Sequence, residues 1–153
     1  IKMASCPHII IRLSWLFSPF GKNFVKTILK LSEVKKTIQV VNDQYGRPTY
    51  GIDLARIVLS NISKPDFFDF NSYNYAMQGT TTWFDFASKI IAIKKSTCQI
   101  KSCSTAEYPT LAKRPKHSVL ETKRIENHLS LNIPSWEDSL KRCLKRIDNN
   151  EKI

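Results

Sequence analysis

The sequence predicts an α/β fold with at least some parallel sheet, because segments with a strand pattern alternate with segments with a helix pattern through its first half. A first strand is expected within residues 8–15, where residues 9–11 form a continuous apolar run typical of a strand buried on both faces. A helix is expected from Phe24, preceded by Asn23 as its N-cap. A second strand is expected over 37–41, which is mostly β-branched.

The later elements follow from the same patterns. We expect, in order, a helix over 52–62, a strand over 66–73, a helix opening at 82, a short strand over 98–103, an extended loop over 105–122, a short helix over 122–129 and a final helix after 134. Thr82 with Asp85, and Ser135 with Asp138, have capping-box spacing, in which the acid reaches back to the amide of the cap residue. Asp138 also precedes Arg142 by four residues, which predicts a surface ion pair.

The overall composition favours a cytoplasmic protein. The 153 residues correspond to about one domain, and 42% of them are hydrophobic. No apolar run approaches the ~20 residues that span a bilayer, and the first residues lack the pattern of a secretory signal. Because the chain starts at Ile1 rather than at a methionine, we interpret it as the interior of a longer protein.

Charge and cysteine content argue against two classes of partner. The net charge of +11 makes nucleic acid the first partner to consider, but the cations are dispersed and form no arginine-rich tract, so we expect no nucleic-acid binding. The four cysteines show no C-x-x-C spacing and are accompanied by three histidines, so reduced thiols are expected rather than a zinc site or disulfides. They are Cys6, Cys98, Cys103 and Cys143.

Two strand ends point to a binding site, since ligands of parallel sheets bind beyond the carboxyl ends of the strands. Trp15 follows the first strand and is either a stacking wall or core packing. Gln44 follows the second strand in "VVNDQYGRPT" and either forms the turn or pairs with the imide edge of a pyrimidine. Arg114 could neutralise a diphosphate, whereas a solvated charge is the preferred interpretation for Arg47 and Lys22.

A catalytic set cannot be assembled from these residues. The four glycines form neither G-x-G-x-x-G nor G-x-x-x-x-G-K, so a glycine-rich phosphate loop is missing. None of the five tyrosines is followed by lysine four residues later, and the three histidines are interpreted as ordinary surface or half-buried residues.

Five segments, taken in order, resemble the dTDP-4-dehydrorhamnose reductase family, a branch of the extended short-chain dehydrogenases/reductases. The segments are "RLSWLFSPFGKNFVKTILKL", "VVNDQYGRPTY", "GTTTWFDFA", "EYPTLAKRPKHSVLETKRIE" and "IPSWEDSLKRCL". The resemblance runs from about residue 5 to residue 145 and covers the carboxyl-terminal half of the family. It implies the last elements of a Rossmann-type parallel sheet plus a small α/β substrate-binding domain. The strands near 8–15 and 66–73 and the helix near 52–62 would belong to the Rossmann layer, with the dinucleotide-binding half absent.

The resemblance also implies a function. The family reduces dTDP-4-dehydro-β-L-rhamnose to dTDP-β-L-rhamnose with NADPH, for bacterial surface polysaccharide. Its dinucleotide loop and catalytic Tyr-x-x-x-Lys pair lie in the half that is missing here. We therefore expect a chain that binds a dTDP-sugar, that is inactive alone, and that forms a homodimer or receives the other half in trans. Uncovered sheet edges lead us to expect poor solubility or a partly molten state.

Six substrate-binding residues are implied by the resemblance, and no catalytic or metal-binding residue. Trp15 would lie by the sugar, Asn23 and Phe24 at the nucleotide end, Gln44 and Thr49 at the thymidine pocket, and Arg114 in a loop that closes over the site. Three departures from the family pattern lie near these residues, at Leu13, Phe17 and Ser18. Phe17 removes a tyrosine hydroxyl that could touch a ligand.

One alternative function stays open from the sequence. The chain could be a non-catalytic relative that acts as an interaction module, like the regulatory β subunit of methionine adenosyltransferase, which shares the fold. The "NDQYGRPT" and "GTTTW" segments favour the reductase interpretation.

Overall fold

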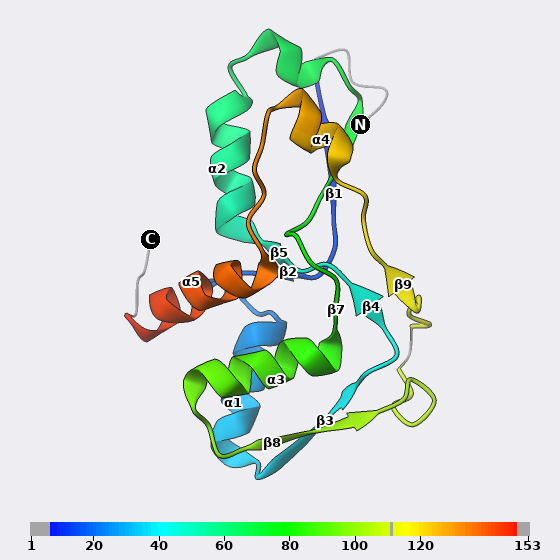
Figure 1. The fold of residues 1–153 in the computed structure, drawn as a ribbon, viewed down its shortest axis with the longest axis vertical. Helices are drawn as coiled ribbons and strands as arrows, with labels where there is room; N and C mark the ends of the chain where they lie inside the picture. The colour runs from blue at the N-terminus through cyan, green and yellow to red at the C-terminus, as the bar shows by residue number, and fades with distance from the viewer. Residues whose placement is uncertain (1–6, 111, 150–153) are drawn as a thin grey trace.

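The computed structural model describes residues 7–110 and 112–149, whose elements form two groups (Figure 1). The upper group contains β1 (Ile10–Leu13), β6 (Ser72–Tyr75), α2 (Gly51–Asn61) and α4 (Lys123–His128). The lower group contains α1 (Phe24–Val34), β3 (Thr37–Val41), α3 (Trp83–Lys94) and β8 (Gln99–Cys103). Helix α5 (Trp136–Asp148) lies between the two groups. The class is α/β, as predicted.

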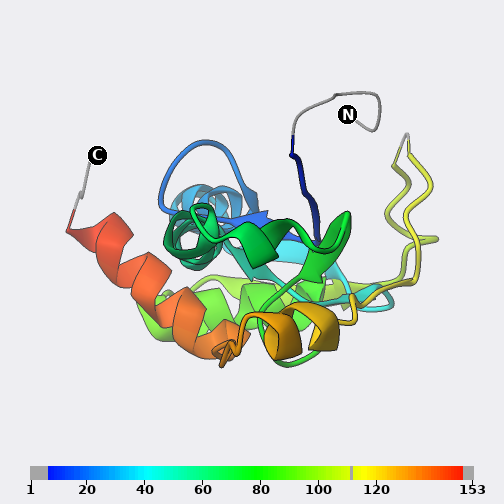
Figure 2. The same cartoon turned by 90° about the horizontal axis from the view of Figure 1, so that it is seen from above.

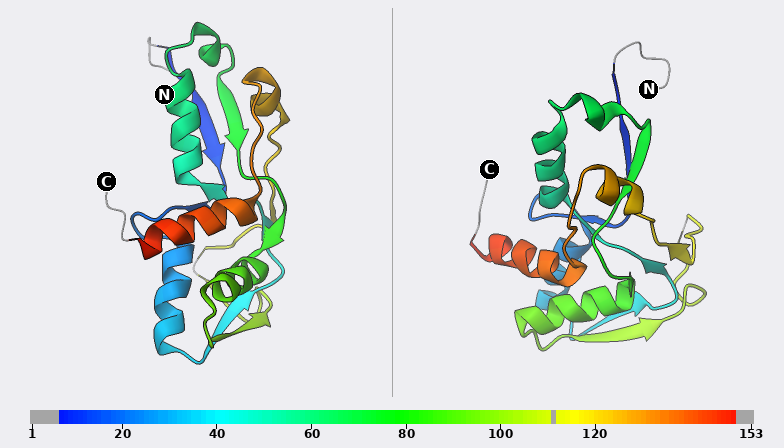
Figure 3. Two further views of the ribbon diagram at one scale, coloured as in Figure 1. Left: turned by 60° about the vertical axis from the view of Figure 1, so that its left-hand side comes forward. Right: turned by 45° about the horizontal axis from the view of Figure 1, so that its top comes forward.

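The upper strands β1 and β6 are parallel, with Ile10 opposite Ser72 and Leu13 opposite Tyr75, and α2 runs alongside them (Figure 3). The prediction of one strand over 66–73 is wrong. Residues Pro65–Phe68 form the 3₁₀ helix η1, and the strand begins only at Ser72. Pro65 has no N–H to give to a ladder and suits the first turn of a helix. The strand β1 is half-buried to exposed rather than covered on both faces.

The lower strands β3 and β8 are also parallel, in register from Thr37 opposite Gln99 to Val41 opposite Cys103. Helices α1 and α3 pack together against this pair. Burial alternates along β3, since Ile38 and Val40 are buried while Gln39 is exposed. This pattern is typical of a strand with one face toward the core and one toward solvent. The predicted N-cap of α1 is confirmed, because the side chain of Asn23 accepts a hydrogen bond from the backbone N–H of Lys26.

The predicted capping pairs Thr82–Asp85 and Ser135–Asp138 both form, but the group that donates to the carboxylate differs from the prediction. The hydroxyl of Thr82 accepts from the backbone N–H of Asp85 at 3.0 Å and donates to its carboxylate at 2.6 Å. Ser135 and Asp138 repeat this arrangement at 3.1 and 2.8 Å. The short aspartate therefore accepts from the cap hydroxyl rather than from the cap amide. The hydrogen bond from Ser135 mainly lowers the pKa of Asp138, and the charge of Arg142 adds to this, so the predicted Asp138–Arg142 attraction is present. The direct ion pair of Arg142 is with Asp53 of α2, which it binds with both Nη atoms.

Short strands connect the two groups. Strand β2 (Leu16–Phe17) pairs in parallel with β5 (Thr49–Tyr50). Strand β4 (Tyr45–Gly46) pairs with both β7 (Thr81–Thr82) and β9 (His117–Ser118). The loop predicted over 105–122 is confirmed apart from β9. Its outer part stands off from the helices, on the side of the molecule away from the end of α5 (Figure 2).

One hydrophobic cluster runs through both groups and includes Phe17, Tyr75, Phe86, Ile125 and Leu140. The thiols of Cys98, Cys103 and Cys143 are reduced and buried, and burial raises the pKa of Cys143 to about 12. Cys6 lies outside the described residues.

Residues 7–110 and 112–149 include neither a membrane-spanning helix nor a cluster of metal ligands. None of the helices there has the length and hydropathy to cross a bilayer. No three His, Cys, Asp or Glu side chains gather there as metal ligands would.

Candidate functional site

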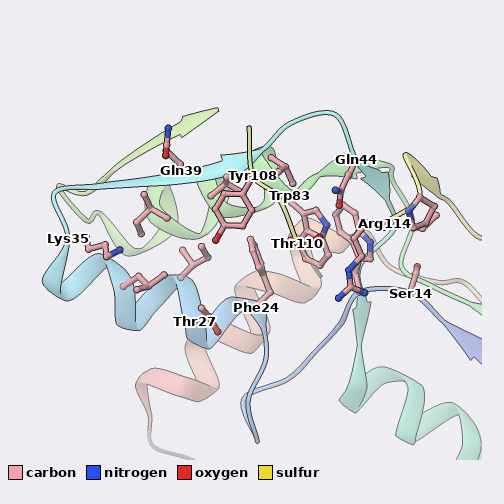
Figure 4. Close-up of a pocket in the computed structure, with 18 of the residues that line it drawn as sticks. Ser14, Phe24, Thr27, Lys35, Gln39, Gln44, Trp83, Tyr108, Thr110 and Arg114 are labelled. Carbon is pink, nitrogen blue, oxygen red and sulfur yellow. The ribbon is translucent and has the colours of Figure 1, made fainter. Parts of the chain in front are cut away.

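A cavity of about 850 Å³ opens between α1, β3 and the loop over residues 104–118. Figure 4 shows that Gln44, Trp83 and Arg114 lie toward one end and Lys35 toward the other, with Phe24 and Tyr108 between them. The cavity runs along the whole of β3, because residues 37–41 line it, and one end of it reaches Trp15 and Gln44, which follow β1 and β3. That end, near Trp15 and Gln44, is where the strand-end rule predicts a ligand.

Stacked aromatic rings form one wall of the cavity. The rings of Trp15 and Trp83 lie 3.7 Å apart, nearly parallel at 11°, and Phe24 packs on Trp83 at 4.5 Å. Trp15 adopts a left-handed backbone conformation with φ of 49°, which is strained for a bulky residue and typical of functional sites. The neighbouring Gly46 permits this geometry, since a Cβ there would lie 2.4 Å from the indole.

The polar residues that end β3 hold the loop against the cavity. The carboxylate of Asp43 accepts from the Thr105 backbone N–H at 2.9 Å and from its hydroxyl at 2.6 Å. These hydrogen bonds lower the pKa of Asp43, because they stabilise the ionised form. Gln44 is 8% exposed and donates from Nε2 to the same hydroxyl at 3.0 Å. The turn and the loop are therefore connected at the edge of the cavity.

Two cations line the cavity at different places. Arg114, which precedes Pro115 in the loop, lies near Gln44, and Lys35 lies at the far end (Figure 4). A guanidinium binds phosphate oxygens in a bidentate manner, so Arg114 suits an anionic ligand. Lys22 is exposed and does not line the cavity, which agrees with the solvated charge predicted for it.

Four of the six predicted binding residues line the cavity: Trp15, Phe24, Gln44 and Arg114. The other two, Asn23 and Thr49, are not among the lining residues. Asn23 caps α1, and Thr49 is fully buried in β5 and donates to the Tyr75 carbonyl at 3.3 Å. Their part in binding stays a prediction.

The departures from the family pattern fall in different places. Leu13 lines the cavity and is 36% exposed. Phe17 is 1% exposed and packs on Tyr50 and Phe86, so a hydroxyl lost there does not face the cavity.

Sequence reasoning missed two contributors to the cavity. Trp83 begins α3 directly after the Thr82 cap, and this spacing could have shown that it lies at the end of a strand. Tyr108 is half exposed and lies in the loop, where no periodic signal marks it. Both side chains present large rings to the same space as Phe24 (Figure 4).

The solvated charge predicted for Arg47 is wrong, because Arg47 is 9% exposed. Its guanidinium donates to the carbonyls of Met77 at 2.8 Å and Leu120 at 2.9 Å, and to side chains of Gln78 and Thr122. Burial lowers the pKa of Arg47, and the nearby carboxylate of Glu126 opposes that change. The group remains charged, since an arginine does not deprotonate in proteins.

The fold and the position of the cavity define the substrate-side part of an extended short-chain dehydrogenase/reductase. The chain belongs to the family described as RmlD substrate binding domain, whose family model matches residues 1–149.

Its relatives include dTDP-4-dehydrorhamnose reductases. The enzyme of Salmonella typhimurium is 36% identical over 152 residues, which cover 92% of this chain and 50% of that enzyme. The crystal structure of the Bacillus anthracis enzyme in complex with NADP matches with a TM-score of 0.85 at 33% identity, over 95% of this chain and 50% of that one. The crystal structure of the Clostridium acetobutylicum enzyme matches with a TM-score of 0.84 at 35% identity, over 92% of this chain and 49% of that one.

The chain thus spans about half the length of these relatives. A more distant structure shares the fold alone: the dTDP-glucose 4,6-dehydratase of Bacillus anthracis has a TM-score of 0.74 at 14% identity. All of these likenesses concern one part of larger proteins.

Proposed function

We propose that this chain is the nucleotide-sugar-binding part of an NADPH-dependent reductase that converts dTDP-4-dehydro-β-L-rhamnose into dTDP-β-L-rhamnose. The observation that carries the proposal is the cavity, which gathers Trp15, Phe24, Gln44 and Arg114 from distant segments of the sequence. The reductases among the relatives support the same function. They lend no support to the alternative of a regulatory subunit.

The chemistry of the cavity suits the parts of a dTDP-sugar. Apolar and aromatic walls bury the faces of a base or sugar, while a few polar groups fix its orientation. In this proposal Trp15 lies by the sugar, and Gln44 offers an amide to the thymine edge. Arg114 neutralises the diphosphate by charge-assisted hydrogen bonds.

The redox half of the reaction needs groups that these 153 residues do not contain. The sequence has no G-x-G-x-x-G loop to hold the pyrophosphate of NADPH and no Tyr-x-x-x-Lys pair to donate a proton. The residues present therefore supply neither the main binding loop of the dinucleotide nor the proton donor. In the proposal they bind and orient the sugar nucleotide for a cytoplasmic enzyme. Strands β1 and β6 and helix α2 would belong to its Rossmann layer, and the chain would either form a homodimer or receive the other half in trans.

Titration calorimetry with dTDP-rhamnose, dTDP, thymidine and duplex DNA tests the proposal. We expect binding of dTDP-rhamnose and dTDP, weaker binding of thymidine, and no binding of DNA. Arg114→Met should lower the affinity for dTDP about tenfold. This corresponds to about 1.4 kcal/mol of binding free energy for a lost charge-assisted contact. Lys22→Met is the matched control, because it removes an exposed cation outside the cavity. Equal affinity for DNA and dTDP would contradict the proposal.

A further inference from the structure

Arg47 contributes no atom to the large cavity, yet its segment supports the aromatic wall. The carbonyl of Arg47 accepts from the Ser14 hydroxyl at 2.6 Å, directly before Trp15. The backbone N–H of Thr49 donates to the Trp15 carbonyl at 3.1 Å, and Gly46 lies against the indole. The backbone around Arg47 therefore holds Trp15 in its strained conformation.

The side chain of Arg47 binds the end of the loop. Its Nη1 donates to the carbonyl of Leu120 at 2.9 Å and to the hydroxyl of Thr122 at 3.2 Å. These residues end the same loop that carries Arg114 into the cavity. Strand β4, just before Arg47, binds that loop as well, because Tyr45 donates to the Lys116 carbonyl at 2.7 Å.

A network of hydrogen bonds fixes the guanidinium itself. Its Nε donates to Met77 and its Nη2 to Gln78. The amide of Gln78 then donates to Glu126 at 2.9 Å, which also accepts from Thr122. The buried positive charge is thus balanced by a carboxylate one contact away. Four of the five guanidinium donors are occupied by these protein acceptors, so Arg47 is engaged on the protein side.

We propose that Arg47 is a positioning residue that sets the loop bearing Arg114 at its working distance from the Trp15 wall. This inference rests on the proposed function, since it assigns Arg47 an effect on the ligand diphosphate through Arg114. Lysine cannot replace it, because one ammonium on a flexible stem does not reach the Met77, Gln78 and Leu120 acceptors together. The effect of Arg47 on binding should therefore depend on the presence of Arg114.

A double-mutant cycle with Arg47→Lys and Arg114→Met tests this dependence. We expect Arg47→Lys to lower the affinity for dTDP about tenfold and the affinity for thymidine less than about twofold, because only dTDP carries the diphosphate. In the Arg114→Met background the same change should cost less than about twofold. Ala106→Ser, at an exposed position of the same loop, is the control and should leave affinity unchanged. Independent, additive effects, or equal losses for dTDP and thymidine, would overturn the proposal.

Amide hydrogen exchange supplies a readout that needs no ligand. In Arg47→Lys the amides of residues 117–122 should exchange faster, while those of α3 exchange as in the wild type. Unchanged exchange over 117–122, or equal acceleration in α3, would overturn the inference. Thr122→Val removes a single acceptor and should give the same pattern to a smaller degree if Arg47→Lys does not fold. If the wild-type chain binds no dTDP, the proposed function fails, and exchange still decides whether Arg47 holds the loop.

Discussion

At the scale of single residues, Gly46 determines how close the Trp15 indole lies to the turn after β4. An added Cβ would lie 2.4 to 2.7 Å from three indole atoms, so Gly46→Ala must displace the ring. We expect a loss of about 1–3 kcal/mol in the free energy of unfolding, as in other overpacked sites. The near-ultraviolet circular dichroism of the stacked Trp15–Trp83 pair should weaken as well.

Gly51→Ala is the matched control for this substitution. Its Cβ would meet nothing closer than 3.6 Å, and Gly51 begins α2, where alanine is the better helix former. We expect unchanged or slightly raised stability and an unchanged aromatic spectrum. If Gly46→Ala has the same effects as Gly51→Ala, close contact with Gly46 does not fix the position of the Trp15 ring.

Asp43 predicts a pH dependence at the same edge of the cavity. Hydrogen bonds from Thr105 lower the pKa of Asp43 in the folded chain below the unfolded value of about 3.9. Its contribution to stability is therefore complete above that pH and lost as the pH falls through the folded pKa. Asp43→Asn should lower the melting temperature at neutral pH and reduce the fall of that temperature as the pH drops below about 3.9. Asp69→Asn, an exposed aspartate, should keep the wild-type profile.

The sequence was informative about single residues where their role is local. The strand-end rule found Trp15 and Gln44 because position in the chain alone marks them. The prediction of a solvated charge failed for Arg47, because its hydrogen-bond acceptors lie 30 to 75 residues away in the sequence. A buried cation and a solvated one look alike until the fold brings such acceptors together.

At the scale of elements, Asp53 of α2 and Arg142 of α5 join two helices through a bidentate ion pair. Asp53 is almost fully buried, whereas the Arg142 side chain is 41% exposed, so solvent screens the pair in part. Arg142→Met should lower the free energy of unfolding by about 2 kcal/mol, between the values for exposed and buried pairs. Urea unfolding at low protein concentration measures it.

Lys141→Met on the same helix gives the comparison for that pair. Lys141 contacts the exposed Asp138 at 3.2 Å, and its loss should cost less than about 0.5 kcal/mol. Equal effects of the two substitutions would mean that the α2–α5 contact does not depend on Arg142.

Element types were predicted well where a cap or a period marks them, as for α1, α3 and α5. The error at 66–73 has a physical cause. Aromatic residues favour strands, yet Pro65 and the inward position of Phe67 favour one turn of 3₁₀ helix there. Pairing of Ser72 with Ile10, far away in the sequence, then fixes where the strand begins.

At the scale of the whole molecule, the continuous core favours a folded chain, while the sheet edges favour association. Strands β1 and β6 pair only with each other within the described residues, so each leaves an edge unpaired. Unpaired edges recruit further strands. We expect light scattering of the isolated chain to show concentration-dependent association. A monodisperse monomer at all concentrations would contradict this expectation.

The central claim is that the cavity binds a thymidine diphosphate sugar, with Trp15 on the sugar and Gln44 on the base. A crystal structure of the chain with dTDP-rhamnose tests it most directly. We predict that both side chains lie within about 4.5 Å of the bound molecule and that Arg114 contacts its diphosphate. A ligand bound elsewhere, remote from Trp15 and Gln44, would contradict the claim.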